Sequence, residues 1–295
     1  MLKVALTGST GMIGSHMKAL LTNKKISFLD VNREVWDLSD WKTDSDLDEI
    51  FNEVEVIFHF AAVLPTNDDD ETRVLFDVNV RSCLNIAQWA TKRNVAIVFM
   101  SSSSVYKNPH ANSIDENSEK VVYGLGGLYG YTKLLAENIF THFIAQGLKA
   151  IILRPTSVYG YGLGENNVID VFIKKAFSND TIELFEANNK VNFIHALDVV
   201  NAALDAYKKS AWGVFNICAK EMVSFNRLAE VIVFNVRLGK SIVLSESISS
   251  FERFDLNCEK AKLSFDFNSK IDIQTGIKMM IHNELLASPS LENEE

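Results

Sequence analysis

Short apolar runs alternate with segments of helical spacing along the first 160 residues. In the helical segments, apolar residues recur at intervals of three and four, which is the period of one helix face. Several runs are apolar throughout, as expected for parallel strands covered on both faces. The predicted strands are residues 4–6, 26–30, 35–38, 54–62, 96–100 and 150–155, and the predicted helices are residues 16–21, 45–54, 72–93 and one that begins at Tyr129. This alternation predicts an α/β fold with a Rossmann-type doubly wound parallel sheet.

The last third of the chain lacks this regular rhythm. The pattern predicts a helix over 167–177, a strand that runs into a helix over 193–208, a strand over 214–217, helices over 225–238 and 273–286, and a short strand over 242–244. We therefore expect a smaller C-terminal α/β lobe beside the main sheet.

Three glycines separate the first strand from the helix that follows it. Gly8, Gly11 and Gly14 have the spacing G-x-x-G-x-x-G. Gly8 allows a sharp turn, Gly11 lets phosphates approach the backbone, and Gly14 lets the helix lie close to the sheet. The helix N-terminus then offers free N–H groups and a partial positive charge to an anion. The segment predicts a dinucleotide site; the alternative is a glycine-rich turn without a ligand.

An acidic residue ends the second predicted strand. Asp30 lies 16 residues after Gly14, near where a dinucleotide fold places the acid that binds the adenosine ribose. Such an acid favours NAD because it would repel the 2′-phosphate of NADP, whereas Arg33 nearby would favour NADP. NAD is the predicted cofactor, and NADP is the alternative. If Asp30 does not bind the ribose, it is a turn residue.

Candidate chemistry gathers after the strand at residues 96–100. Serines occupy positions 101–104, and ligands of open parallel sheets bind at this carboxyl edge; the alternative is a serine-rich turn. Tyr129 and Lys133 are four residues apart and so share one helix face. An ammonium there stabilises a phenolate and lowers the pKa of the phenol, which suits proton transfer. A Y-x-x-x-K match also arises by chance in chains of this length. His59, in the strand at 54–62, is predicted to be a buried packing residue rather than a catalytic one.

Composition narrows the class of protein. The chain has 295 residues, 47% hydrophobic content and a net charge of -9, which disfavours nucleic acid and anionic membranes as partners. The chain has three cysteines, Cys83, Cys218 and Cys258, which are far apart in sequence and follow no spacing motif. An odd number of cysteines without a motif indicates a reducing compartment and argues against a disulfide framework or a zinc site. No run approaches the roughly 20 apolar residues of a membrane span. The first strand begins too early for a signal peptide. We predict a cytoplasmic protein without a metal.

Taken together and in order, the motifs resemble those of the NAD-dependent epimerase/dehydratase family, extended short-chain dehydrogenase/reductases that modify nucleotide sugars. The matching positions run through most of the chain. They are Gly8, Gly11, Gly14, Asp30, Asp37-Leu38, His59-Phe60-Ala61-Ala62, Asn79, Ser102, Tyr129, Lys133, Arg154-Pro155, Phe193-Ile194-His195 and Asp198.

The resemblance implies a role for each of these segments. Ser102, Tyr129 and Lys133 would be catalytic, with Tyr129 as acid and base. The implied cofactor contacts are Gly8, Gly11, Met12, Ile13, Gly14, Asp30, Arg33, Asp37, Leu38, Phe60, Ala61, Ala62, Asn79, Tyr129, Lys133 and Thr156. The expected substrate contacts, for a nucleotide sugar, are Ser103, Ser157, Asn167 and Lys190.

The resemblance also implies the organisation of the chain. Residues 1–160 with about 190–220 would form the dinucleotide-binding domain, and about 161–189 and 221–287 the substrate-binding lobe. The polar composition of residues 288–295 separately predicts a disordered tail. A homodimer is expected, built by the helices at 72–93 and 129–145. Leu84, Ala87, Leu134 and Phe140 have the helical spacing for it, and the alternative is that they face the chain's own sheet.

Departures from the family pattern narrow the reaction. Dehydratases follow the catalytic threonine with Asp-Glu, where this chain has Ser103-Ser104, so a dehydratase is disfavoured. Epimerases often place Arg-Asp before Phe-Ile-His, and the arginine binds the substrate diphosphate. This chain has Val191-Asn192 at these positions, so Lys190 is the candidate to replace the arginine.

Two further departures are typical of the family's reductases: the link from Asp30 to Asp37 is short, and Lys107 follows Tyr106 in place of the usual glycine. The predicted activity is that of an NAD(P)-dependent nucleotide-sugar epimerase or 4-keto reductase. The alternative is a non-catalytic NAD(P)-binding regulatory or scaffold protein.

Overall fold

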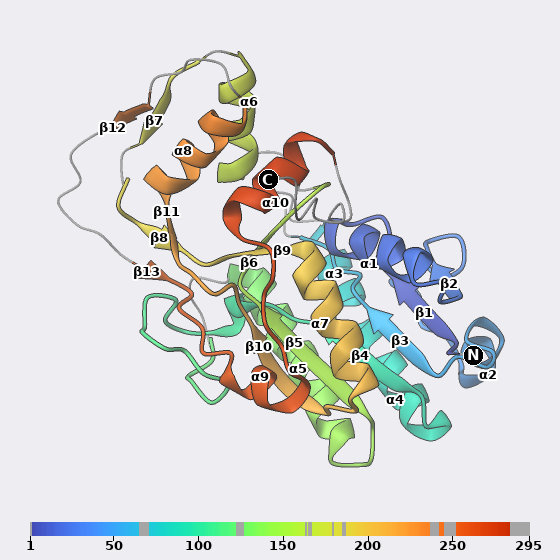
Figure 1. Ribbon diagram of the computed structural model, residues 1–295. Helices are drawn as coiled ribbons and strands as arrows, with labels where there is room; N and C mark the ends of the chain where they lie inside the picture. The colour runs from blue at the N-terminus through green and yellow to red at the C-terminus, as the bar shows by residue number, and fades with distance from the viewer. Residues whose placement is uncertain are drawn as a thin grey trace.

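A six-stranded parallel sheet forms the centre of the molecule (Figure 1). The computed structural model describes residues 2–64, 71–121, 127–162, 164, 167–178, 180–184, 187–236, 242–244 and 252–283. The strand order is β10-β5-β4-β3-β1-β2, which confirms the predicted fold class. The strands are β1 (Val4–Thr7), β2 (Phe28–Val31), β3 (Val56–His59), β4 (Ala96–Met100), β5 (Ala150–Pro155) and β10 (Gly213–Ile217).

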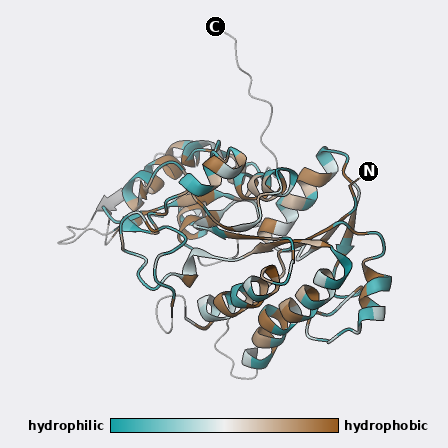
Figure 2. Cartoon of the chain, turned by 90° about the horizontal axis from the view of Figure 1, so that it is seen from below, coloured by the Kyte–Doolittle hydropathy of each residue, from teal (hydrophilic) through white to brown (hydrophobic). Residues whose placement is uncertain are grey.

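Helices cover both faces of this sheet (Figure 2). On one face, α1 (Met12–Asn23), α7 (Ala196–Lys208) and α9 (Glu259–Phe265) share a core with the strands. On the other face lie α2 (Asp44–Ile50), α4 (Ser82–Arg93) and α5 (Gly127–Ile144). Because each face has its own core, β3, β4 and β5 are buried along their whole length, and their sequences are apolar except for His59 and Arg154.

The predicted strand at residues 35–38 is wrong. After β2 the chain forms turns, in which the Asn32 side chain accepts hydrogen bonds from the backbone N–H groups of Glu34 and Val35. Trp36 is buried, but it packs against Phe51 as part of a turn rather than as a strand residue. The apolar pattern at 35–38 therefore reflects tertiary packing of one large side chain.

The predicted helix over 72–93 is interrupted. It consists of α3 (Glu71–Phe76), a π-helical turn η1 (Asp77–Arg81) and α4. Such turns are common at functional sites. This one carries Asn79.

Most of residues 157–195 and 223–281 form small sheets and helices beyond the carboxyl end of the main sheet, whereas α7, β10 and α9 belong to the main domain (Figure 1). Here α6 (Val168–Ser178), α8 (Phe225–Val236) and α10 (Ile273–Ile281) enclose a third core. The short strands are β6 (Ser157–Tyr159), β7 (Ile182–Leu184), β8 (Lys190–Val191), β9 (Phe193–His195), β11 (Val223–Ser224), β12 (Ile242–Leu244) and β13 (Glu252–Arg253). The predicted domain boundaries stay a prediction, and the expected tail at 288–295 lies outside the described residues.

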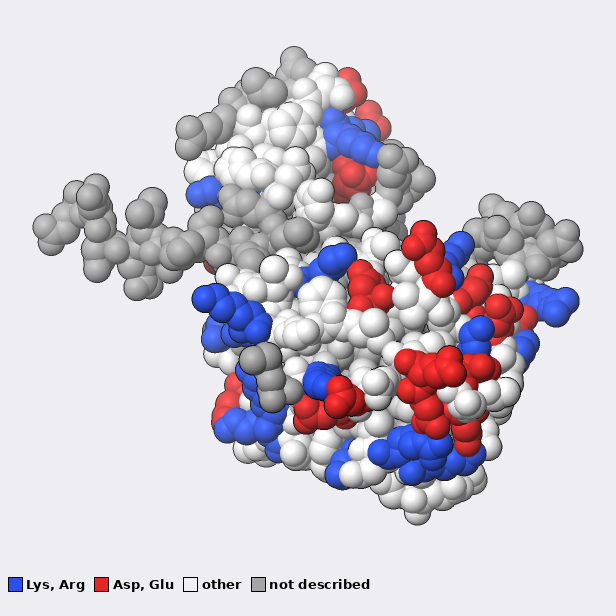
Figure 3. All heavy atoms as spheres, turned by 90° about the vertical axis from the view of Figure 1, so that its right-hand side faces the viewer, with Lys and Arg blue, Asp and Glu red and all other residues white. Residues whose placement is uncertain are grey.

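The surface of the main domain is charged but mixed in sign. Figure 3, which faces the side at the right of Figure 1, shows acidic and basic side chains gathered next to one another. Ion pairs between elements include Lys92–Asp44 and Arg93–Asp48, which join α4 to α2. In the described part of the chain, no helix is both long and apolar enough to cross a membrane.

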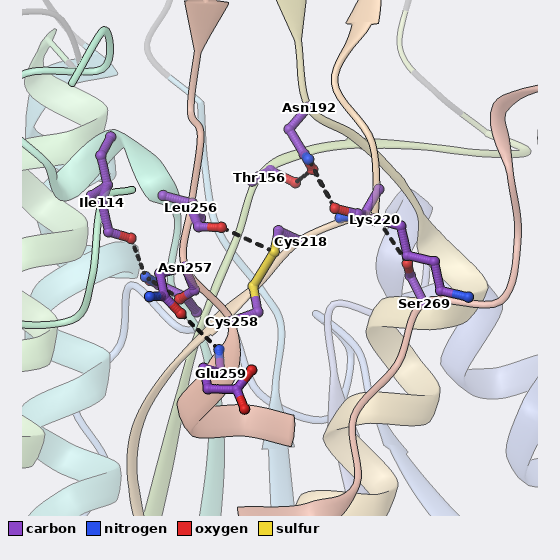
Figure 4. Close-up of a disulfide and its surroundings, with 12 residues drawn as sticks. Ile114, Thr156, Asn192, Cys218, Lys220, Leu256, Asn257, Cys258, Glu259 and Ser269 are labelled. Carbon is purple, nitrogen blue, oxygen red and sulfur yellow. Dashed lines mark hydrogen bonds between the residues drawn. A yellow bond between two sulfur atoms is a disulfide. The ribbon is translucent and has the colours of Figure 1, made fainter. Parts of the chain in front are cut away.

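One disulfide contradicts the expectation drawn from the cysteines. Cys218, which follows β10, is bonded to Cys258, the N-terminal cap residue of α9 (Figure 4). The two cysteines are 40 residues apart in sequence, but α9 packs on β10, where the rings of Phe215 and Phe265 are 5.2 Å apart. Cys83 remains a free, buried thiol.

We predict that the Cys218→Ser/Cys258→Ser variant unfolds more easily than the wild type. Opening a loop of this length restores chain entropy to the unfolded state and lowers the free energy of unfolding by about 3–4 kcal/mol. Urea denaturation of both proteins, with and without dithiothreitol, measures the difference. A wild type whose stability does not change with dithiothreitol would show that the bond contributes nothing.

Candidate active site

The glycine turn between β1 and α1 has the shape of a phosphate cradle. Gly8 has φ +74°, and a Cβ on it would lie 2.5 Å from the backbone N of Ala61. A Cβ on Gly14 would lie 1.9 Å from the Gly8 carbonyl oxygen, so α1 approaches the turn only because this residue is glycine. Gly11 caps α1 without a side-chain hydrogen bond, which leaves the first N–H groups of the helix for a ligand. The turn therefore fits a dinucleotide diphosphate.

Asp30 lies on β2 next to this turn. It is in register with Leu6 of β1, and its Oδ2 is 3.0 Å from Lys18 Nζ. Burial alone would raise the pKa of Asp30, but hydrogen bonds from Ser9 and Lys18 lower it below its usual value. Asp30 is thus a carboxylate at neutral pH, as a ribose-binding acid must be.

The other residues expected around the adenosine lie in the turns after β2. Asp37 accepts hydrogen bonds from the backbone N–H and the hydroxyl of Ser39, which lower the pKa of its carboxyl. Leu38 packs against the core of the α2 face. Their contacts with adenine stay a prediction, as does the role of Arg33.

Asn79 joins the segment after β3 to α5. Its amide donates to the Val63 carbonyl and accepts from the Val63 N–H, both at 2.8 Å, and its Nδ2 lies 3.3 Å from Thr132 Oγ1. The side chain thus fixes the loop that contains Ala61 and Ala62 against the helix that carries Tyr129. Its expected role as a cofactor contact stays a prediction; its contacts show that it also shapes the wall of the site.

The serine turn, residues 101–106, leads from the carboxyl end of β4 into the 3-10 turn η2 (Ser103–Val105). Ser102 Oγ donates to Ser104 Oγ at 3.0 Å and accepts from the Ser104 N–H at 3.1 Å. The first turn of α5 packs directly on it, because a Cβ on Gly130 would lie 2.5 Å from the Ser104 carbonyl oxygen. Tyr129 precedes this glycine, so the structure brings the serine turn and the tyrosine together.

Lys133 lies one turn further along α5 and is buried. Its Nζ donates to the Met100 carbonyl at 2.8 Å and lies 4.8 Å from the centroid of the Phe99 ring and 5.7 Å from that of the Tyr129 ring. Burial lowers the pKa of Lys133 to about 8 and raises the pKa of Tyr129 to about 12. The shift of Tyr129 is opposite to the lowering that the sequence predicts, because desolvation of the phenol dominates where the ammonium bonds a carbonyl.

His59 lies beneath these residues and is fully buried. Its Nδ1 is 2.9 Å from Thr7 Oγ1 and its Nε2 is 3.5 Å from Cys83 Sγ. Burial lowers the pKa of His59 to about 3, so the imidazole is neutral.

The expected substrate residues are spread over several elements. Ser103 is buried in η2, and Ser157 starts β6. Asn167 accepts from the N–H of Asp170 at the start of α6, and Lys190 Nζ lies 2.9 Å from Glu252 Oε1. Thr156, expected beside the cofactor, donates to Asn192 Oδ1 at 2.8 Å (Figure 4). Among the residues that the structure describes, no hydrogen bond or ion pair joins Asn167 or Lys190 to the serine turn.

The structure adds one candidate residue, Arg253. In the pairing of β13 with β8, Arg253 is in register with Val191, the position at which related epimerases often have arginine. Its guanidinium lies 4.9 Å from the centroid of the Phe254 ring, and its buried Nε has no hydrogen-bond partner within the described residues. No local motif marks this residue, because the pairing joins positions 62 residues apart.

Comparisons with known proteins agree with this geometry. Residues 4–218 match the family model described as NAD dependent epimerase/dehydratase family. The chain is 30% identical over 305 residues to a putative UDP-glucose 4-epimerase from Methanocaldococcus jannaschii, an alignment that covers 95% of this chain and 97% of that protein.

Solved structures of similar fold include two Bacillus cereus enzymes. UDP-N-acetylglucosamine 4-epimerase superposes with a TM-score of 0.81 at 23% identity and covers 95% of both chains. UDP-glucuronic acid 4-epimerase, in complex with UDP-glucuronic acid and NAD, superposes with a TM-score of 0.79 at 18% identity and covers 96% of this chain and 98% of that one.

The two glycines of the cradle make a matched pair for mutation. We predict that Gly14→Ala lowers the free energy of unfolding by about 2 kcal/mol or more, because its Cβ collides with backbone that cannot move aside. Gly11→Ala should cost less than about 1 kcal/mol, since its Cβ meets only the Gly8 oxygen at 3.5 Å. Denaturant titration measures both. Equal stability of the two variants would contradict the packing described for α1.

Proposed function

The chain belongs to the NAD dependent epimerase/dehydratase family, and we propose that it is a nucleotide-sugar 4-epimerase acting on a UDP-hexose. The observation that carries this proposal is the packing of the serine turn of β4 on the tyrosine helix α5 at the carboxyl edge of the sheet. The similarity to a putative UDP-glucose 4-epimerase along 95% of the chain supports the choice of reaction.

NAD is the cofactor of the family, and the residues present fit it. The N-terminus of α1 and the space beside Gly11 would hold the diphosphate, and Asp30 would hold the adenosine ribose. The Asp30 carboxylate would repel a 2′-phosphate, which favours NAD over NADP. When bound, NAD supplies reversible acceptance of a hydride from a sugar carbon.

The protein's own residues would then move the proton. Tyr129 would take the proton of the sugar hydroxyl and return it, while the Ser102 hydroxyl donates a hydrogen bond to the same oxygen. For Tyr129 to act as a base, its pKa must fall from about 12. A turn of the Lys133 ammonium from the Met100 carbonyl toward the phenol would lower it. Lys133 is close enough for this, since both side chains lie on the same face of α5.

A second candidate is reduction of a 4-keto sugar. A protonated Tyr129 is the form that donates a proton to a ketone oxygen, and burial favours this form. The short link from Asp30 to Asp37, which is typical of the family's reductases, favours the same reaction. The two candidates differ in stoichiometry, because a reductase consumes one reduced coenzyme for each product and an epimerase consumes none.

The substrate diphosphate needs a cation that this chain lacks at position 191. We propose Arg253 for this role, because the pairing of β13 with β8 brings it beside Val191 and its Nε has no partner in the described chain. Lys190, the replacement expected from the sequence, is paired with Glu252. Arg253 would therefore bind the diphosphate more directly than Lys190.

We also propose a homodimer built by α3, α4 and α5. Val74, Leu84, Leu128 and Tyr131 are between 37% and 41% exposed on these helices, whereas Ala87 and Phe140 are buried in the chain's own core. Leu134 is half-buried and packs against Tyr106 and its neighbours. The exposed set is the part of the expected interface that remains for a second copy.

Leu84→Glu should convert the dimer into a monomer, because a carboxylate would be buried without a partner at its centre. Analytical ultracentrifugation of the variant measures this, with Leu263→Glu as the control, since Leu263 is 77% exposed on α9. A Leu84→Glu protein that sediments like the wild type would place the interface elsewhere.

The reaction itself is tested with nucleotide sugars and coenzyme. Purified protein is incubated with UDP-glucose, UDP-galactose and a panel of GDP-, dTDP- and CDP-sugars, with product analysis by chromatography and absorbance at the reduced-nicotinamide band. Interconversion of the UDP-hexoses without net change in absorbance is the expected result. Stoichiometric loss of added NADH with a 4-keto sugar would instead assign the reductase.

Tyr129→Phe should lower kcat about 10²–10⁴-fold, because the proton has no other carrier. Its affinity for NAD, measured by calorimetry, should stay within a few-fold of the wild type. Turnover that survives the substitution would disprove the role of Tyr129, and turnover by neither protein on any sugar would favour the non-catalytic alternative.

A further inference from the structure

The proposed reaction uses neither charge of a buried ion pair beneath the site. Glu137 of α5 and Arg154 of β5 are 3% and 5% exposed. Arg154 Nε donates to Glu137 Oε1 at 2.9 Å and Oε2 at 3.2 Å, and a terminal nitrogen donates to Oε2 at 2.5 Å. Burying both charges costs solvation free energy that hydrogen bonds must offset. Their remaining hydrogen bonds show what the pair holds.

Glu137 holds the beginning of the serine turn. The Ser101 hydroxyl donates to Glu137 Oε1, and Ser101 directly precedes Ser102. One helical turn earlier, Lys133 donates to the carbonyl of Met100. Two consecutive residues at the end of β4 are therefore bonded to two residues of one α5 face, four positions apart, and Tyr129 continues that face.

Arg154 holds the other end of the same turn. Its NH1 donates to the Tyr106 hydroxyl at 3.0 Å and to the Glu116 carbonyl at 3.1 Å. Tyr106, only 1% exposed, donates in turn to Asn216 Oδ1 at 2.6 Å. Tyr106 is the residue at which η2 ends, so the four residues that include Ser102 lie between the two anchored side chains.

We propose that the Glu137–Arg154 pair is a positioning unit that clamps both ends of the serine turn, so that Ser102 Oγ reaches the oxygen that Tyr129 protonates. The pair does not touch the reacting atoms. It acts through Ser101 and Tyr106, the two side chains that flank the turn. This inference rests on the proposed function for its kinetic consequence, but the clamp itself is a property of the protein alone.

Ser101→Ala and Tyr106→Phe test the clamp, because each releases one end of the turn and leaves the ion pair intact. Substituting Glu137 or Arg154 would instead leave a buried charge unpaired and risk unfolding. Each variant should lower kcat on the order of tenfold or more through misplacement of Ser102. The Kd for NAD and the KM for the sugar should stay within twofold of the wild type.

Ser82→Ala is the matched control. Ser82, like Ser101, is a buried serine whose hydroxyl donates a hydrogen bond, but its acceptor is the backbone carbonyl of Val78 at 2.5 Å, and it lies in α4. The Ser82→Ala variant should lose stability as Ser101→Ala does, but its kcat should stay that of the wild type. A Ser101→Ala kcat equal to that of Ser82→Ala would overturn the proposal, because a merely structural serine lowers the melting temperature alone.

Amide hydrogen exchange tests the clamp without any activity. The N–H groups of Val105 and Tyr106 donate to the carbonyls of Ser102 and Ser103 at 3.3 and 3.1 Å. Their exchange should accelerate at least about tenfold in Ser101→Ala and Tyr106→Phe and not in Ser82→Ala. Unchanged exchange would refute the clamp even if the wild type proves inactive, whereas an inactive wild type with accelerated exchange would count only against the proposed function.

Discussion

The site depends on how closely α5 lies against the carboxyl end of β4. Gly130 removes the Cβ that would otherwise collide with the Ser104 carbonyl, and Lys133 and Glu137 bond the last residues of the strand from the same helix face. The first turn of this helix, which contains Tyr129, therefore packs on the serine turn. The parallel sheet supplies the rest, because the glycine turn after β1 and the serine turn after β4 end at the same edge.

Burial is what gives these ordinary side chains their chemistry. It raises the pKa of Tyr129 to about 12 and lowers the pKa of Lys133 to about 8, so the protein alone keeps the phenol protonated and the ammonium easy to neutralise. In the proposed reaction, a turn of the Lys133 ammonium toward the phenol would lower the pKa of Tyr129. The buried Glu137–Arg154 pair bonds Ser101 and Tyr106 at the two ends of the serine turn, which is a reason to retain two charges that a hydrophobic pair could replace.

Much of the architecture could be predicted because short stretches of sequence determine it. Apolar runs gave the strands β3, β4 and β5, and the glycine spacing gave the turn before α1. The pattern failed where contacts between distant residues determine the structure. The apolar residue at position 36 reflects the burial of Trp36 against Phe51 and not a strand. The Cys218–Cys258 bond joins segments 40 residues apart, and the pairing of Arg253 with Val191 joins two short strands that no motif marks. The raised pKa of Tyr129 depends on desolvation, which a Y-x-x-x-K spacing does not express.

The central claim is that Ser102, at the end of a strand, and Tyr129, on a helix, both form a hydrogen bond with the same oxygen of the substrate. A crystal structure of the Tyr129→Phe variant with NAD and a UDP-hexose, compared with the wild type bound to NAD, measures this most directly. The account predicts a sugar hydroxyl oxygen within about 3.2 Å of Ser102 Oγ, at a position that superposes within the same distance of the wild-type Tyr129 hydroxyl. A sugar bound elsewhere, or two hydroxyls too far apart for one oxygen to reach both, would contradict it.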